Sequence, residues 1–315
     1  MLFSSGSLNF RNGGMLGLAV AAGLAAVGSI GLAPAQANIT GLYGQWLTGP
    51  ASSGAYANTA PNAGTGGYGT SGDALTLTSN SNTTWNATGG PGGSGYLQLE
   101  SASGAPGYLT TNAVTNLDLT GSYTVSGWVN FNSYGNVGGL EIFNTRYGNV
   151  SINDNGTGGM DIQTVGNSTG LTGLHGDIGT STGWLETSAD AAYPFATGKW
   201  YMVTYAVTGD ANGGNVVIYV NGASAATVDW TNPANTSYIP ALLETGTNPS
   251  QFEIGASAGG VSAGVADFRI YNTQLSSDQV SSLYNSVIPE PATLGLMAVA
   301  GAGILLVKRR KPKQA

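Results

Sequence analysis

Few side chains in this sequence could carry out a reaction. There is one histidine, His175, and no cysteine, so disulfides and thiolate metal sites are excluded. A serine hydrolase would need His175 as its base, but the glycine-rich segment around His175 predicts a solvated loop instead. Zinc is disfavoured because one histidine without cysteine leaves too few of its usual ligands.

Carboxylates could act as a pair in glycoside hydrolysis, which requires two of them across the scissile bond. Pairing Glu253 with Asp267 would require a spatial coincidence that the sequence does not indicate. Calcium is a further possibility, because Asn153–Gly156 and Asp161 supply oxygen ligands. Asp154 and Asp161 are therefore candidate calcium ligands. The alternative is an ordinary hairpin loop, which the Asn-Gly pair favours.

The tryptophans could bind a ligand, because a sugar ring stacks well on an exposed indole. Trp85, Trp184 and Trp230 are flanked by polar residues and are the candidates for ligand binding. Packing in the protein interior is the alternative for each of them. Trp128 and Trp200 lie in apolar strands and are predicted to be core residues.

The charge of the chain is unevenly distributed. Between the two ends only Arg146, Lys199 and Arg269 are basic, against fifteen carboxylates up to Asp278, which gives this body a net charge of about −12. A body this acidic repels phosphate backbones, so nucleic acid is not an expected partner.

Short strands separated by turn residues make up most of the body, so an all-β sandwich is predicted. In residues 123–131, Tyr, Val and Phe alternate on one face, with Trp128 on the other. Residues 150–154 and 160–165 are predicted to form a hairpin, as are residues 200–207 and 216–220. Asn221-Gly222 predicts a tight turn into residues 225–230. Ser276 to Gln279 resembles a capping box and predicts a short helix ending near Tyr284.

The N-terminal residues 1–37 are predicted to be a signal peptide. Apolar and small residues from Met15 to Ala33 precede Ala35 and Ala37, which fit a small-x-small cleavage pattern and predict a mature start at Asn38. The Sec export machinery is then the expected partner in export. An uncleaved membrane anchor is the alternative.

The C-terminal residues 287–315 have the features of a membrane anchor. Sixteen mostly apolar residues, Ala292–Val307, would span about 24 Å as a helix, and flanking lysines can extend that reach. The basic tail Lys308, Arg309, Arg310 and Lys311 predicts a cytoplasmic end, with the body outside.

Pro289, Glu290 and Pro291, followed by this helix and basic tail, resemble the PEP-CTERM sorting signal. The resemblance implies recognition and cleavage by an exosortase. It also implies a Gram-negative host that makes exopolysaccharide, and a destination at the cell surface or in the extracellular matrix after transient anchoring in the inner membrane. A simple tail anchor is the alternative.

The body resembles a laminin-G-like domain of the concanavalin A-like lectin/glucanase superfamily, over residues 38–286 and best over 95–286. The matching segments are residues 95–99, 106–110, 122–130, 198–205, 216–222, 252–255, 264–276 and Leu283-Tyr284. The resemblance implies a two-sheet antiparallel jelly roll that binds carbohydrate or protein, often with Ca²⁺. The Glu-x-Asp-x-x-Glu cluster of the glucanases on this fold is absent from the sequence.

Three functions remain open from the sequence. The first is a non-enzymatic surface or matrix protein that binds glycan or protein, in exopolysaccharide or a biofilm. The second is a structural protein without a discrete ligand, and the third is a glycan-active hydrolase. A cleft holding two carboxylates about 5–9 Å apart would favour the third.

Overall fold

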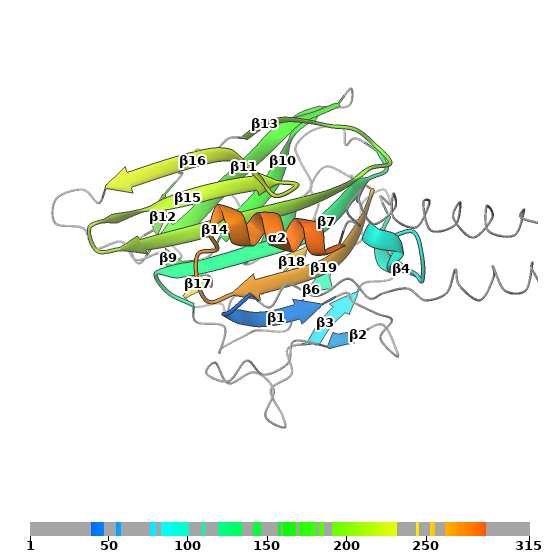
Figure 1. The fold of residues 1–315 in the computed structure, drawn as a ribbon, viewed down its shortest axis with the longest axis horizontal. Helices are drawn as coiled ribbons and strands as arrows, with labels where there is room; N and C mark the ends of the chain where they lie inside the picture. The colour runs from blue at the N-terminus through cyan, green and yellow to red at the C-terminus, as the bar shows by residue number, and fades with distance from the viewer. Residues whose placement is uncertain are drawn as a thin grey trace, which may run out of the picture. The chain divides into compact units, whose positions relative to one another are not determined.

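β-Strands dominate the part of the chain that the structure, a computed structural model, describes (Figure 1). All described residues belong to one unit, residues 37–315. They are residues 39–46, 55–57, 76–79, 83–100, 109–110, 119–133, 141–145, 157–158, 160–167, 170–180, 183–185, 191–231, 244–245, 253–255 and 262–287.

The first of two large antiparallel sheets, sheet A, is built from the longest strands. In order across the sheet these are β16 (Ala223–Thr231), β15 (Gly213–Val220), β14 (Trp200–Asp210), β7 (Ser122–Phe131), β19 (Ala263–Tyr271), β5 (Tyr96–Leu99) and β4 (Thr83–Asn86), and β1 (Leu42–Trp46) also pairs with β19. Strands far apart in the sequence are neighbours, so sheet A is assembled from both halves of the body.

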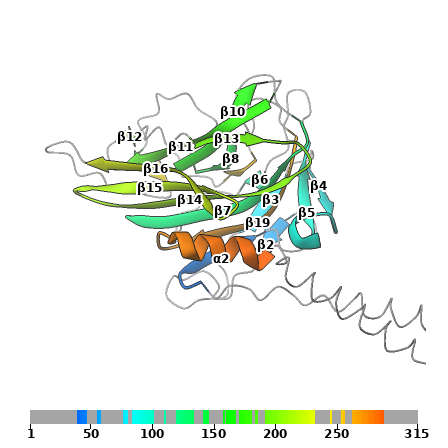
Figure 2. The same ribbon diagram turned by 45° about the horizontal axis from the view of Figure 1, so that its top comes forward.

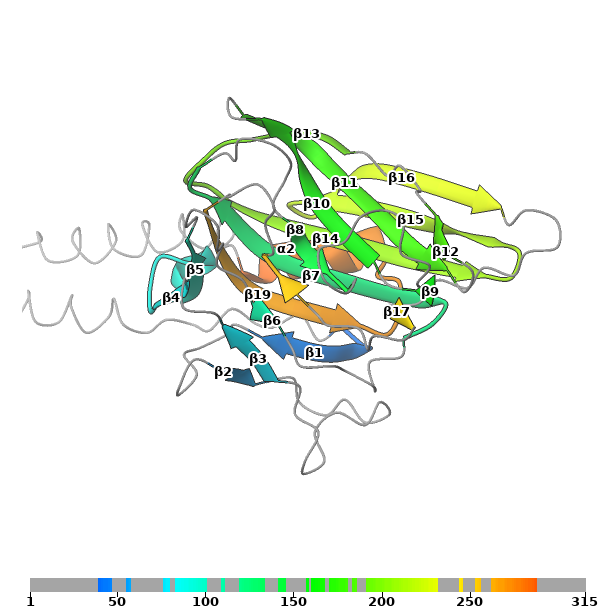
Figure 3. The same cartoon turned by 180° about the vertical axis from the view of Figure 1, so that it is seen from behind.

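The second sheet, sheet B, faces sheet A (Figure 3). Its order is β12 (Gly183–Leu185), β11 (Gly170–Thr180), β10 (Met160–Asn167), β8 (Glu141–Asn144), β18 (Glu253–Ile254), β6 (Leu109–Thr110), β3 (Thr76–Ser79) and β2 (Ala55–Ala57), with β13 (Ala191–Phe195) paired to β11. A separate pair joins β17 (Glu244–Thr245) to β9 (Thr157–Gly158). The predicted two-sheet antiparallel sandwich is confirmed.

The main core lies between the two sheets and follows the predicted alternation. Tyr123, Val125, Val129 and Phe131 of β7 point into it, whereas Trp128 lies in a second apolar cluster on the other face of sheet A. The predicted burial of Trp128 is confirmed, at 2% exposure, and Ile270 of β19 is fully buried. Trp200 is only half-buried, because its ring lies at the margin of the second cluster, and its indole N–H donates to the Gly89 carbonyl at 2.8 Å.

The hairpins are partly as predicted. β14 pairs with β15, and β15 pairs with β16 through a turn in which Asn221 and Gly222 have φ of 53° and 80°. The side-chain oxygen of Asn221 accepts the Met202 N–H at 2.9 Å, which fixes this turn. The predicted pairing of residues 160–165 differs, because β10 pairs with β11 and β8. Residues 150–154 lie outside the described residues.

A helix, α2 (Ser277–Val287), covers the outer face of sheet A (Figure 2). Its capping box is confirmed: Ser276 Oγ accepts the Gln279 N–H, and Gln279 Oε1 accepts the Ser276 N–H. Val280 and Leu283 are buried, and Tyr284 stacks on Trp128 with ring centroids 5.6 Å apart. The helix continues beyond the predicted end at Tyr284 to Val287.

Among the described residues, no helix combines the length and apolarity needed to cross a membrane. The predicted signal helix in residues 1–37 and the predicted transmembrane helix at 292–307 lie outside the described residues.

The hydroxyl of Tyr123 is buried and has no hydrogen-bond partner among the described residues. Removing a buried hydroxyl that makes no hydrogen bond removes its desolvation cost. We therefore expect Tyr123→Phe to raise the free energy of unfolding in urea by about 1 kcal/mol. A fall in the free energy of unfolding would instead show that the hydroxyl makes a favourable interaction.

Burial also raises the pKa of Tyr123 well above its usual range. A raised folded-state pKa contributes stability that is present below the unfolded pKa, about 10, and is lost as pH rises above it. Titration between pH 9 and 11.5 should therefore destabilise the wild-type protein more than Tyr123→Phe.

Candidate functional site

Sheet B presents a row of polar side chains on the face that points away from the main core. On β10, Met160 and Ile162 enter the core, so Asp161 between them lies on the opposite face. Directly opposite neighbours in an antiparallel pair share a face. The registers pair Asp177 of β11 with Asp161, Asp161 with Asn144 of β8, and Asn144 with Glu253 of β18. We call these four residues the acidic row.

The acidic row is strongly shielded from solvent. Exposure is 4% for Asp161, 6% for Asp177 and 9% for Glu253, and Asn144 is equally buried. Carboxylates in such surroundings require hydrogen-bond or ionic partners, because burying an isolated charge is costly. Asp177 has such a partner in His175, whose Nε2 lies 3.1 Å from its Oδ2.

The accessible margin of the row is formed by the next pair along the same two strands. His175 of β11 and Gln163 of β10 are cross-strand neighbours beside the Asp161–Asp177 pair. The His175 side chain is 27% exposed and Gln163 is half-exposed. Val165, further along β10, is 42% exposed, which is high for an aliphatic side chain. Imidazole, amide and a small apolar surface therefore meet solvent at this margin.

The position of His175 corrects the sequence prediction of a solvated loop. It lies inside β11, and the glycines around it serve packing. A Cβ at Gly176 would overlap the ring of Tyr205, which crosses from sheet A onto the β11 backbone. Glycine is required at this position because an aromatic ring approaches the backbone closely. In the sequence, a glycine present for this reason looks the same as a glycine in a loop.

The calcium prediction can be followed only at one of its two residues. Asp161 is in the acidic row, whereas Asp154 lies outside the described residues. In the part of the chain that the structure describes, no three His, Cys, Asp or Glu side chains converge so as to hold a metal ion. Asp161 and its two direct neighbours, Asp177 and Asn144, supply two carboxylates and one amide, which do not complete a calcium shell of six to eight oxygens. Calcium binding stays a prediction from the sequence.

The candidate tryptophans are not brought together. Trp85 on β4 and Trp230 on β16 lie on strands at opposite edges of sheet A, and both are half-buried against the main core. Trp184 is on β12 in sheet B, and its side chain lies outside the described residues. A ligand-binding role for each stays a prediction, but Trp85 and Trp230 cannot share one site.

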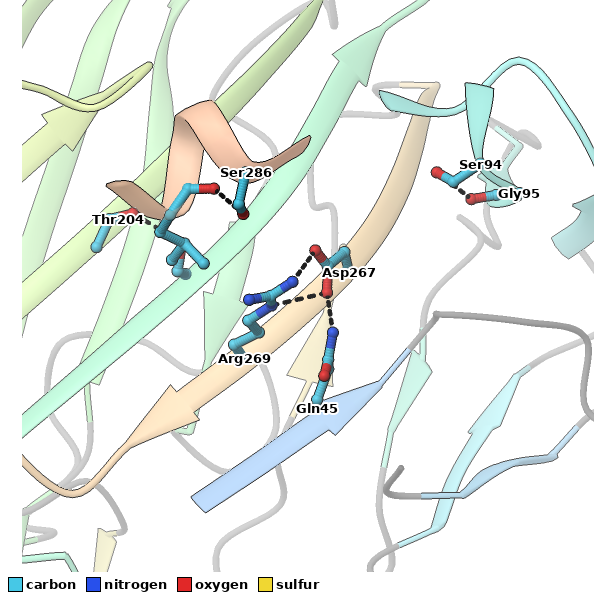
Figure 4. A network of polar contacts seen from close by, with 9 residues as sticks. Gln45, Ser94, Gly95, Thr204, Asp267, Arg269 and Ser286 are labelled. Atoms are coloured by element: carbon cyan, nitrogen blue, oxygen red, sulfur yellow. Dashed lines mark hydrogen bonds and ion pairs between the residues drawn. The ribbon is translucent and has the colours of Figure 1, made fainter. Parts of the chain in front are cut away.

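A second polar cluster joins β1 to β19 on sheet A (Figure 4). Asp267 accepts from Arg269 Nε at 2.9 Å and from its terminal nitrogen at 2.7 Å, and Gln45 donates to the same carboxylate at 2.6 Å. Burial lowers the pKa of Arg269, but Asp267 and Tyr271 raise it above its usual range. Asp267 sits at a bulge with φ of 48°. The contacts of this cluster hold β1 against β19. Asp267 lies on sheet A and Glu253 on sheet B, so Asp267 and Glu253 do not form a carboxylate pair.

Gly-x-Ser-x-Gly segments occur at residues 166–170, 179–183, 255–259 and 260–264. The nucleophile elbow of hydrolases requires a strand, a sharp turn and then a helix. Each of these segments is flanked by strands on both sides, β10 to β11, β11 to β12 or β18 to β19. The described elements next to these segments are therefore strands and not the helix that an elbow requires.

The residues predicted for sorting lie outside the described residues. These are the cleavage residues Ala35 and Ala37, the motif Pro289, Glu290 and Pro291, and the tail Lys308, Arg309, Arg310 and Lys311.

Comparison with known families gives two matches. Residues 103–281 match a laminin-G family described as the concanavalin A-like lectin/glucanases superfamily, which covers more than half of the chain. Residues 287–311 match the PEP-CTERM protein-sorting motif. A comparison with curated proteins yields no match.

Solved structures of neurotoxin binding domains share the fold. The botulinum neurotoxin serotype C1 binding domain is similar with a TM-score of 0.51 and 15% identity, over 79% of this chain and 53% of that one. The binding domain of botulinum neurotoxin DC in complex with SialylT matches with a TM-score of 0.51 and 15% identity, over 79% and 52%. The same domain in complex with rat synaptotagmin II gives 0.51 and 16%, over 79% and 52%. The chain spans about half the length of these structures, and the likeness concerns the fold.

Proposed function

Because the chain belongs to the concanavalin A-like lectin/glucanases superfamily and carries a PEP-CTERM sorting motif, we propose that it is an exported, exosortase-sorted protein whose jelly roll binds glycan. Residues 1–37 are the export signal, residues 38–286 the binding domain and residues 287–315 the sorting signal. The destination is the cell surface or matrix of a Gram-negative bacterium, and the exopolysaccharide found there is the proposed ligand.

The observation that carries the binding proposal is the margin of the acidic row. His175 and Gln163 can exchange hydrogen bonds with sugar hydroxyls, and Val165 offers apolar contact to a ring face. Asp177 fixes the imidazole through the 3.1 Å contact, so His175 is held in place before a ligand arrives. Such preorganisation reduces the entropic cost of binding.

Binding is also the role named for the neurotoxin domains that share this fold. The neurotoxin binding domain in complex with SialylT supports a glycan as ligand, and the complex with rat synaptotagmin II supports a protein as the alternative. A low-affinity site repeated over many copies suits a polymer matrix, where multivalency supplies the strength.

The experiment is retention of residues 38–288 on columns of the host's exopolysaccharide, with and without Ca²⁺, beside a glycan array. We expect retention without turnover. No retention on any glycan or surface protein would favour a structural protein without a discrete ligand. Retention that requires added Ca²⁺ would indicate that calcium takes part in ligand binding.

A specific observation favours a hydrolase as the second candidate. Asp161 and Asp177 are directly opposite each other on neighbouring strands, which places their Cβ atoms about 4.5–5.5 Å apart. Retaining glycosidases hold two carboxylates about 5–5.5 Å apart. Against catalysis, both side chains are more than nine-tenths buried. Turnover on polysaccharide that is abolished by Asp161→Asn would establish the hydrolase and overturn the proposal of pure binding.

Sorting makes a separate prediction. Cleavage near Pro289–Pro291 removes the apolar segment and the basic tail. Mass spectrometry of the surface-released protein should therefore detect no peptides from Leu294 onward, and an N-terminus at Asn38. An intact C-terminus on released protein would contradict processing at the motif.

A further inference from the structure

The last described element of the domain ends close to the sorting motif in the sequence. Val287, the last residue of α2, is half-buried in the outer cluster of sheet A together with Tyr96 and Trp200. A Cβ at Gly92 would collide with the Val287 carbonyl oxygen, so the loop before β5 closes over the end of the helix. One residue, Ile288, separates this packed end from Pro289.

The length of chain outside the domain then limits how far the domain can stand from the membrane. Five residue steps lead from Val287 to Ala292, the first residue of the proposed membrane segment. Fully extended, they reach about 17 Å. The domain is some 33 Å long, judged from the eleven residues of β14. The tether is therefore too short to let the domain turn freely above the membrane.

The described chain reaches the start of the tether at one end of the domain. That end consists of the loop 87–95, the turn 196–200 and the last turn of α2, residues 282–287, and we call it the tether end. The three segments are joined by the Trp200–Gly89 hydrogen bond at 2.8 Å and by the contact of Gly92 with Val287.

The charges of the described surface differ between the tether end and the rest of the domain. The tether end contains no acidic residue and one exposed lysine, Lys199, although the body as a whole is strongly acidic. Two described exposed carboxylates border this end: Asp278 lies about one turn of α2 before residue 282, and Glu100 lies where β5 ends. The remaining ones, Asp210 and Asp229, lie toward the opposite end, near the β14–β15 hairpin. Anionic headgroups repel carboxylates within about one Debye length, roughly 8 Å.

We propose that the tether end lies against the lipid headgroups while the precursor is anchored, with the β14–β15 hairpin pointing away from the membrane. The inference rests on the sorting and anchoring part of the proposed function and is independent of glycan binding. It assigns a membrane-facing surface to a domain whose acidic charge would otherwise hold it off the bilayer.

The absence of cysteine from the chain allows a direct test. Ser94→Cys places one thiol on the tether end, and the matched control Asn212→Cys places one at the exposed β14–β15 turn. The full chain, expressed in a bacterium without an exosortase, is labelled with a fluorophore. It is then reconstituted in phosphatidylethanolamine–phosphatidylglycerol vesicles that carry a nitroxide quencher on the headgroup. Insertion of about twelve Gly/Ser residues after Ile288 lengthens the tether in a third sample.

We expect quenching of the dye at residue 94, no quenching at residue 212, and loss of the quenching at residue 94 when the tether is lengthened. Equal quenching at both positions, or stronger quenching at residue 212, overturns the inference. Quenching at residue 94 that survives the longer tether also overturns it, because the contact would then be an adhesion independent of the tether. A chain that does not float with the vesicles is not anchored in them, which overturns the anchoring proposal and this inference together. Retention of residues 38–288 on glycan would be unaffected by that result.

Discussion

Replacing Arg269 with methionine should lower the free energy of unfolding by about 3–5 kcal/mol. Arg269 is 5% exposed, and its guanidinium donates two hydrogen bonds to Asp267, at 2.9 and 2.7 Å. Without it, the Asp267 carboxylate keeps Gln45 as its described partner but loses the opposing charge. The cost is high because an uncompensated, largely buried charge remains. Urea unfolding of residues 38–288 measures the effect.

Two variants separate the loss of the ion pair from a general effect of removing a cation. Lys199→Met makes the same chemical change at an exposed position and should alter stability by no more than about 0.5 kcal/mol. Asp267→Asn combined with Arg269→Met removes both charges and should recover much of the loss. A loss below about 1 kcal/mol for Arg269→Met alone would show that the pair contributes little to stability.

Trp128→Ala should cost a comparable amount, about 3–5 kcal/mol, because it removes the largest fully buried side chain of the domain's described part. Its ring lies between sheet A and α2, stacked on Tyr284 at 5.6 Å with an interplanar angle of 23°. The variant should also speed amide exchange in α2, since the helix loses the surface on which Tyr284 packs.

Trp200→Ala is the matched control on the same face of the same sheet. Trp200 is half-buried and meets Tyr96 edge-on with centroids 5.3 Å apart, so its truncation leaves a smaller cavity and should cost less. If Trp200→Ala destabilised the domain as much as Trp128→Ala, burial beneath α2 would not be the source of the Trp128 effect.

Local signals in the sequence were sufficient for much of the fold. The alternation in β7, the Asn221-Gly222 turn and the Ser276–Gln279 capping box each depend on residues close together in the chain, and the structure has all three. The predicted loop around His175 is wrong because Gly176 allows the close approach of Tyr205, and composition alone does not distinguish that reason from flexibility.

The candidate site could not be predicted, because it depends on pairing between distant strands. Asp161 and Asp177 come from one hairpin, but the predicted loop around His175 excludes Asp177 from a strand, so the sequence does not indicate that the two carboxylates are neighbours. Asn144 and Glu253 join them through β8 and β18, which are more than a hundred residues apart. No local pattern specifies that register, since loop lengths and the packing of both sheets determine it.

The central claim is that the margin of the acidic row binds glycan, and retention of surface variants on exopolysaccharide tests it most directly. His175→Ala with Gln163→Ala removes the two half-exposed polar groups and leaves the core intact, and Thr227→Ala on the exposed side of β16 is the control. Losing two hydrogen bonds of about 1 kcal/mol each should weaken retention about 30-fold, whereas the control should be retained like the wild type. Removing His175 also takes away the described partner of Asp177, so urea unfolding must first show that the double variant is folded. Wild-type retention by the folded double variant would contradict the account.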